Sequence, residues 1–146
     1  MRSWEVLEHA LEQDLALVSR GVIEFGRGLA VAGKAKAVAC LVREGKTIIA
    51  GRTGKTEYSR LFVNYLWVTG NLRGQGLGTA VLDRLESEAL IRGCTEALLE
   101  TLDDRTARLY GRLGYNQVGT VARYVGPFTK YIMVKVLRPH KETSGV

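Results

Sequence analysis

The feature of the sequence that most constrains the fold is residues 61–92, which predict a strand, a glycine-rich loop and a helix. Residues 61–68 are apolar, β-branched or aromatic except for Asn64, a pattern typical of a strand covered on both faces. Residues 77–92 have one apolar face at helical spacing, made of Val81, Leu82, Leu85 and Ala89. Gly93 is a suitable residue to end this helix.

Between the strand and the helix lies Arg73-Gly74-Gln75-Gly76-Leu77-Gly78. Glycines allow a tight turn whose backbone N–H groups can approach a ligand, and a helix N-terminus attracts phosphate or pyrophosphate. A turn that only packs the helix against the strand would also use such glycines. A dinucleotide-binding loop would instead need G-x-G-x-x-G, and glycines at 74, 76 and 78 do not have that spacing.

The strand ending at Leu66-Trp67-Val68, followed by Arg-x-x-Gly-x-Gly at 73–78, resembles the acyl-coenzyme A loop of the GNAT superfamily of N-acetyltransferases. Residues 108–115, RLYGRLGY, are similar to a second signature of that family, in which a helical tyrosine, here Tyr110, precedes Leu-Gly-aromatic. The resemblance covers about residues 38–137. The sequence departs from the common family pattern at Asp103 and Thr106, where Asn and Ala are frequent.

This resemblance implies a mixed α/β sheet of six to seven strands, with a splay between strands four and five and three to four helices. It implies one acetyltransferase domain over residues 1–146, of which 138–146 form a polar tail. It also implies transfer of an acetyl group from acetyl-coenzyme A directly to a primary amine, with Tyr110 as the general acid that protonates the leaving thiolate. The implied coenzyme A-binding residues are Leu66, Trp67, Val68, Arg73, Gly74, Gln75, Gly76, Leu77, Gly78 and Thr79.

Before the glycine loop, the pattern predicts mostly helix in 1–34, or alternatively a short first strand around Trp4 to Leu7, with a break at the glycines 26, 28 and 33. Strand 35–42 is expected to pair antiparallel with 46–52. Residues 51–60 are expected to form a polar connection. The segment GRTGKT within it resembles a phosphate-binding P-loop, but the required spacing and the following helix are absent.

After the glycine loop, strand 96–102 is expected to lie parallel to strand 61–69, because helix 77–92 connects them. Asp103 or Asp104 can cap a helix over 105–113. Residues 115–124 and 131–137 predict a final antiparallel pair across the turn at Gly126-Pro127.

The net charge of +6 suits a polyanion such as coenzyme A or nucleic acid, although nucleic acid is the less favoured partner. A second hypothesis is therefore a catalytically silent acyl-coenzyme A sensor or nucleic-acid-associated module of the same fold. Cys40 and Cys94 lie in or beside apolar runs, as reduced core cysteines do. His9 and His140 have no ligand-like neighbours, so no metal site is predicted.

The sequence predicts no membrane span and no signal peptide, so a cytoplasmic location is expected. The resemblance allows a homodimer. Glu57, Glu100 and Asp103 are candidates for a general base, and the sequence does not choose among them. It also does not identify the amine acceptor.

Overall fold

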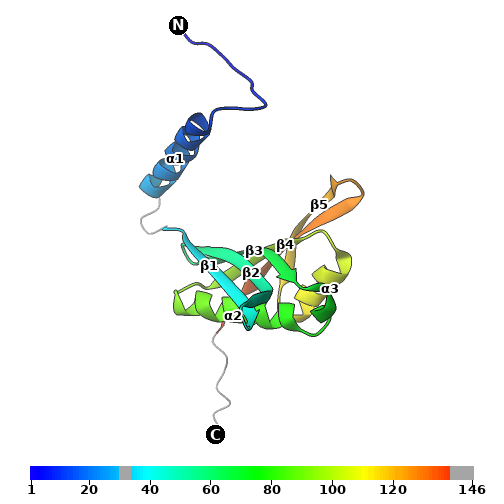
Figure 1. Ribbon diagram of the computed structural model, residues 1–146. Helices are drawn as coiled ribbons and strands as arrows, with labels where there is room; N and C mark the ends of the chain where they lie inside the picture. Colours follow the sequence, from blue (N-terminus) through cyan, green and yellow to red (C-terminus); the bar gives the residue numbers. More distant parts are fainter. Residues whose placement is uncertain (30–33, 139–146) are drawn as a thin grey trace. The chain divides into compact units, whose positions relative to one another are not determined.

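The computed structural model describes residues 1–29 and 34–138, and the chain divides into two compact units, 1–33 and 34–146 (Figure 1). In the first unit, α1 (Glu12–Leu29) begins with acidic residues in its first turn, which suit a helix N-terminus. The helix expected in 1–34 is therefore confirmed for 12–29. The helix continues through Gly26 and Gly28, so the break expected there was wrong. The described residues before α1 form no strand.

The predicted residues that lie outside the described ranges are Gly33, His140 and the tail from 139 onward. Within the described ranges, no helix is long and apolar enough to span a membrane.

The second unit contains one sheet of six strands in the order β1-β2-β3-β4-β6-β5. The strands are β1 (Lys36–Glu44), β2 (Thr47–Glu57), β3 (Arg60–Val68), β4 (Glu96–Thr101), β5 (Asn116–Val125) and β6 (Phe128–Val136). The first three form an antiparallel meander, and β4, β6 and β5 form a second antiparallel set. The two sets meet where β3 and β4 run parallel, as the sequence predicted.

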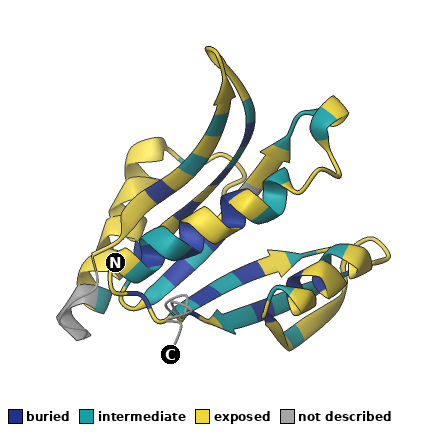
Figure 2. Ribbon diagram, turned by 90° about the horizontal axis from the view of Figure 1, so that it is seen from below, coloured by how far each residue is buried: buried dark blue, intermediate teal, exposed yellow. Residues whose placement is uncertain are grey.

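Two helices cover the sheet. α2 (Leu77–Ile91) connects β3 to β4 and packs on β1, β2 and β3, whereas α3 (Asp104–Arg112) packs on β4, β5 and β6. A short 3₁₀ turn, η1 (Gly70–Leu72), precedes α2. Figure 2 shows buried residues along the sides of the helices and strands that face one another. The largest fully buried side chains are Leu61, Val81, Leu82, Leu85 and Leu99.

β3 and β4 separate soon after they begin. Their ladder contains only Arg60 with Glu96, Leu61 with Ala97 and Phe62 with Leu98. Beyond Phe62, the backbone of β3 has no partner on β4. This is the predicted splay, which falls between the third and fourth strands because the described chain has no earlier strand.

The polar connection expected at 51–60 was wrong, because β2 continues to Glu57. Its inward positions are Ala50, Arg52, Gly54 and Thr56, which are buried at alternate residues as in any strand with one covered face. Two of these are polar and one is glycine, so apolar alternation is absent from the sequence. Gly54 is required by close approach, because an added Cβ would lie 2.5 Å from the carbonyl oxygen of Phe62.

Candidate functional site

A cavity of about 250 Å³ lies between the end of β3, the glycine loop, the start of α2 and one face of α3. It is lined by nine of the residues that the sequence predicted for the site, which are Leu66, Val68, Arg73, Gly74, Gly76, Leu77, Gly78, Thr79 and Tyr110. Trp67 does not line it, since successive strand residues point to opposite faces, and its side chain is half exposed. Gln75 does not line it either and is exposed in the loop.

The glycine loop leaves the N-terminus of α2 free to bind an anion. Gly74 and Gly76 have φ angles of +80° and +81°, a left-handed conformation that suits glycine. Gly76 is the N-cap of α2, no side chain accepts a capping hydrogen bond, and the first turn contains no acidic residue. The donors of this turn are therefore not taken by a capping side chain, and the helix dipole there favours a phosphate group.

Arg73 is held against the end of β3 at the same cavity. Its Nε donates a hydrogen bond to the carbonyl oxygen of Val68 at 3.1 Å. This contact sets a positive charge beside the uncapped N-terminus of α2, so charge and dipole favour the same kind of ligand.

Tyr110 lies on the buried face of α3 with only 5% of its surface exposed. Its Oη accepts a hydrogen bond of 2.9 Å from Nη1 of Arg52, and the same guanidinium lies 5.5 Å from the centre of its ring. Tyr110 is therefore both a core aromatic and a residue that lines the first cavity, so packing and chemistry are not alternatives for it.

Arg52 was not among the site residues expected from the sequence, because it lies where the expected strand 46–52 meets the expected polar connection 51–60. Arg52 projects inward from β2 and is 4% exposed. Its Nε donates to the carbonyl oxygen of Asn64 at 3.2 Å. The β2–β3 register shifts at this point, since two residues of β3, Asn64 and Tyr65, stand opposite Thr53 alone. Such a bulge turns backbone groups away from the ladder, and Arg52 binds the carbonyl group that is freed.

A second cavity of about 560 Å³ lies where β3 and β4 separate. It is lined by Arg52, Phe62, Val63, Asn64, Leu66, Leu98 and Glu100. It shares Arg52 and Leu66 with the first cavity, so these two side chains form a common wall.

Of the three carboxylates suggested by the sequence as a base, Glu100 lines the second cavity. Its Oε2 lies 2.8 Å from Nζ of Lys130, and this hydrogen bond raises the pKa of the lysine. Glu57 pairs instead with Lys55 at the end of β2. Asp103 caps α3 by accepting hydrogen bonds from Thr106, which lower the pKa of its carboxyl group.

The ring of Tyr115 packs against the ring of Tyr110, with ring centres 5.8 Å apart. Its hydroxyl donates to Oε2 of Glu86 at 3.1 Å, and Oε1 of Glu86 lies 2.6 Å from Nζ of Lys135. Burial, followed by the Glu86 charge, raises the pKa of Tyr115. Its proton is thus committed to Glu86, which leaves Tyr110 as the tyrosine hydroxyl at the cavity.

A family model described as acetyltransferase (GNAT) family matches residues 5–115, which is most of the chain. The chain belongs to this family. Enzymes of the family take the acetyl group from acetyl-coenzyme A, so this acetyltransferase uses acetyl-coenzyme A as its donor substrate.

Relatives and solved structures agree with the family. The acetyltransferase is similar to the blasticidin-S acetyltransferase of Streptomyces morookaense, with 32% identity over 91 residues that span 62% of this chain and 67% of the relative. The fold is similar to that of an acetyltransferase from Bacillus cereus, with a TM-score of 0.81, 23% identity, and 91% and 98% of the two chains covered.

The fold is also similar to that of an aminoglycoside 6'-N-acetyltransferase complexed with coenzyme A. The TM-score is 0.62 at 16% identity, with 88% and 90% of the two chains covered. At these identities, the two structural likenesses show the fold alone.

Proposed function

We propose that the acetyltransferase binds acetyl-coenzyme A in the first cavity and a primary amine in the second, and transfers the acetyl group directly between them. The observation that carries this proposal is the common wall formed by Arg52 and Leu66, with Tyr110 beside it in the first cavity. Because both cavities reach these two residues, a ligand in each cavity can approach the other there. The two ligands can then react without a covalent enzyme intermediate, since the enzyme holds their reacting atoms together.

The fit of the donor is supported by the glycine loop. The uncapped first turn of α2 and the Arg73 guanidinium suit a pyrophosphate, and the end of β3 has free backbone where its ladder with β4 has stopped. In this proposal the pantetheine arm lies along Leu66 to Val68. Its thioester then lies near Tyr110 and the common wall.

In the reaction, the neutral amine attacks the thioester carbonyl carbon and gives a tetrahedral intermediate. The C–S bond then breaks, and Tyr110 donates the proton that the leaving thiolate accepts. The nitrogen of the intermediate, which carries a positive charge after the attack, loses one proton to solvent, and Tyr110 recovers a proton from solvent, so product formation leaves the enzyme unchanged. The thiol of coenzyme A has a pKa of about 8.5, above neutral pH, so the sulfur leaves more readily when it receives a proton as the C–S bond breaks.

The amine must first lose its own extra proton, and for an amine with a pKa of about 10.4 this costs roughly 4–5 kcal/mol at neutral pH. We assign Glu100 to this step, because it lines the cavity assigned to the amine. Lys130 holds the carboxylate from one side, with Nζ 2.8 Å from Oε2.

The test is release of free coenzyme A, followed with a thiol reagent, across a panel of amines. The panel should include blasticidin S and aminoglycosides, after the names of the similar enzymes, together with amino acids and polyamines. With an accepted amine, Glu100→Gln should lower kcat while Glu57→Gln, a matched change at the end of β2, should not. Equal kcat values for the Glu100→Gln enzyme and the wild type would overturn the role of Glu100. Tight coenzyme A binding without release of thiol for any amine would overturn transfer to an amine.

A further inference from the structure

We propose that Arg52 is a positioning residue for the transfer step: it fixes the direction of the Tyr110 hydroxyl and places an uncompensated positive charge beside it. This inference rests on the proposed function, since it assigns a role to the partner of the proposed general acid. Residue 52 lies outside both family signatures, and the role assigned to it follows from the contacts of its side chain.

The contact with Arg52 fixes the direction of the Tyr110 hydroxyl proton. Nη1 of Arg52 donates to Oη of Tyr110 at 2.9 Å. A guanidinium has donors and no acceptor, so the Tyr110 proton cannot point back at Arg52. Tyr110 lines the first cavity, and a group bound there can take that proton. The hydrogen bond from Arg52 therefore turns the hydroxyl into a donor aimed at the ligand.

The Arg52 guanidinium is itself held by two hydrogen bonds. Nε donates to the Asn64 carbonyl oxygen at 3.2 Å while Nη1 donates to Tyr110, and the residue is 4% exposed. Because the guanidinium is planar, one hydrogen bond to an acceptor on β3 and one to an acceptor on α3 fix its orientation. The bulge in β3 supplies the first of these acceptors, so the sheet sets the position of the Tyr110 oxygen.

The positive charge of Arg52 is buried. Within residues 1–29 and 34–138, no carboxylate forms an ion pair with Arg52. Glu86, beside the neighbouring Tyr115, is already paired with Lys135. A buried charge without a counter-ion is costly to the fold, which favours a role beyond stability.

That charge acts when the proton leaves. As the C–S bond breaks and the proton moves from Tyr110 to sulfur, negative charge develops on the phenol oxygen, 2.9 Å from Nη1. A fixed positive charge in a water-poor site stabilises this state more than the ground state. The phenolate is then reprotonated, so proton balance is unchanged from the mechanism above.

The test is a double-mutant cycle between Arg52→Met and Tyr110→Phe, with kcat normalised to the number of coenzyme A sites found by calorimetry. In the Tyr110 background, Arg52→Met should lower kcat by about 10- to 100-fold, the range expected for a charged hydrogen bond made in the transition state. The Kd for coenzyme A should change by less than about threefold, and Arg52→Lys should restore part of kcat. In the Tyr110→Phe background, Arg52→Met should have almost no further effect.

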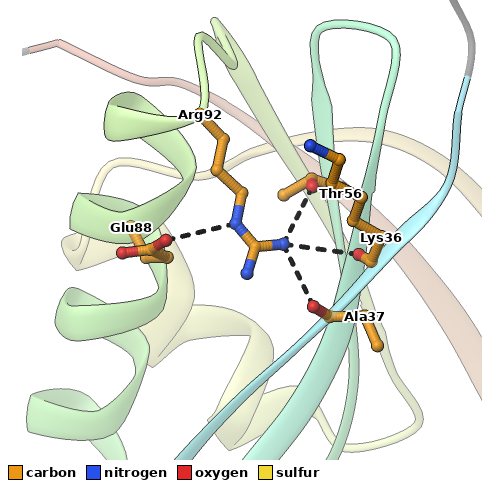
Figure 3. Close-up of polar contacts among 5 residues, drawn as sticks. All are labelled: Lys36, Ala37, Thr56, Glu88 and Arg92. Carbon is orange, nitrogen blue, oxygen red and sulfur yellow. Dashed lines mark hydrogen bonds and ion pairs between the residues drawn. The ribbon is translucent and has the colours of Figure 1, made fainter.

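Arg92→Met is the matched control, because Arg92 is also held by several hydrogen bonds but does not line either cavity. Figure 3 shows its guanidinium between α2 and the sheet, where Nη1 reaches the carbonyl oxygens of Lys36 and Ala37 and Oγ1 of Thr56. Arg92→Met should lower the free energy of unfolding and leave kcat per coenzyme A site unchanged.

Three outcomes overturn the inference. An equal loss of kcat in both Tyr110 backgrounds would show that Arg52 acts independently of Tyr110. An unchanged kcat with a raised Kd for coenzyme A, or a raised KM for the amine, would make Arg52 a ligand-binding residue. If Arg52→Met does not fold, the same cycle is run with Arg52→Lys. The inference is then overturned if Arg52→Lys causes no loss of kcat, or the same loss of kcat in the Tyr110 and Tyr110→Phe backgrounds. If Tyr110→Phe alone has no effect on kcat, the proposed function fails first, and the two failures are thereby distinguished.

Discussion

The change from Tyr110 to phenylalanine removes one hydroxyl group from a site where that group has both a structural contact and a proposed chemical role. The ring keeps its packing against Tyr115, since the ring centres lie 5.8 Å apart and phenylalanine preserves the ring. If the hydroxyl protonates the leaving thiolate, kcat should fall by roughly 10²–10⁴, the usual contribution of one general acid. The affinity for coenzyme A should change little.

The same substitution also has a calculable effect on stability. Nη1 of Arg52 loses its acceptor while the residue stays 4% exposed, so its remaining hydrogen bond is the one to the Asn64 carbonyl group. Leaving a buried donor unpaired lowers the free energy of unfolding by about 1–3 kcal/mol. Denaturant unfolding measures this loss separately from kcat, and a folded variant should show both effects.

The matched control is Tyr131→Phe. The Tyr131 hydroxyl is also hydrogen-bonded, to Asp104, but it lies outside the first cavity. This variant should keep the kcat of the wild type. Rapid-quench measurement of the acetylated product establishes whether chemistry limits turnover. If it does, wild-type kcat in a folded Tyr110→Phe enzyme contradicts the assignment and returns this tyrosine to a packing role.

Gly78→Glu should abolish binding of coenzyme A in calorimetry with the fold intact, because a carboxylate would occupy the proposed pyrophosphate position. Gly78→Ala, the control, should retain binding. Unchanged affinity for coenzyme A in the folded glutamate variant would refute the assignment of this loop to the pyrophosphate. Gly54→Ala should lower the free energy of unfolding by roughly 1–3 kcal/mol or more in denaturant titrations, because its Cβ would lie 2.5 Å from the Phe62 carbonyl oxygen. Wild-type stability in this variant would show that β2 and β3 can move apart without cost. Asp103→Asn should unfold at a lower temperature than the wild type at neutral pH, because hydrogen bonds from Thr106 lower the pKa of the folded carboxyl from its ordinary value. The ionised form therefore stabilises the fold above the unfolded-state pKa, and the difference in unfolding temperature should shrink as pH falls through the folded pKa. A difference that does not depend on pH would contradict this role of the carboxylate.

The central part of the fold could be predicted from the sequence, because its signals are local. Apolar periodicity and glycines placed the strand, loop and helix of 61–92, and the structure has β3, the loop and α2 there. Asp103 was one of two candidates for the cap of α3 and is the N-cap. These features depend on residues that are neighbours along the chain, so one sequence is sufficient to predict them.

The far half of β2 could not be predicted in the same way. Its buried positions include Arg52, Gly54 and Thr56, which in a sequence suggest a polar turn. Each is explained only by contacts from other elements: Tyr110 accepts from Arg52, β3 approaches Gly54, and Arg92 donates to the Thr56 hydroxyl. A strand whose buried face is polar cannot be recognised by hydrophobic alternation.

One polar residue within the apolar strand did carry information about the site. Asn64 interrupts an otherwise apolar run, and in the structure it lies in the bulge, where its side chain lines the second cavity and its carbonyl group binds Arg52. Asn64 is exposed, as are Leu66 and Trp67 after it, so this half of β3 is not covered on both faces as its apolar pattern suggested. This exception in the pattern of 61–68 lies two residues after Phe62, where the ladder of β3 with β4 ends, and at the register shift between β2 and β3. At that point the sheet opens toward the proposed amine site, and Arg52 connects that opening to Tyr110.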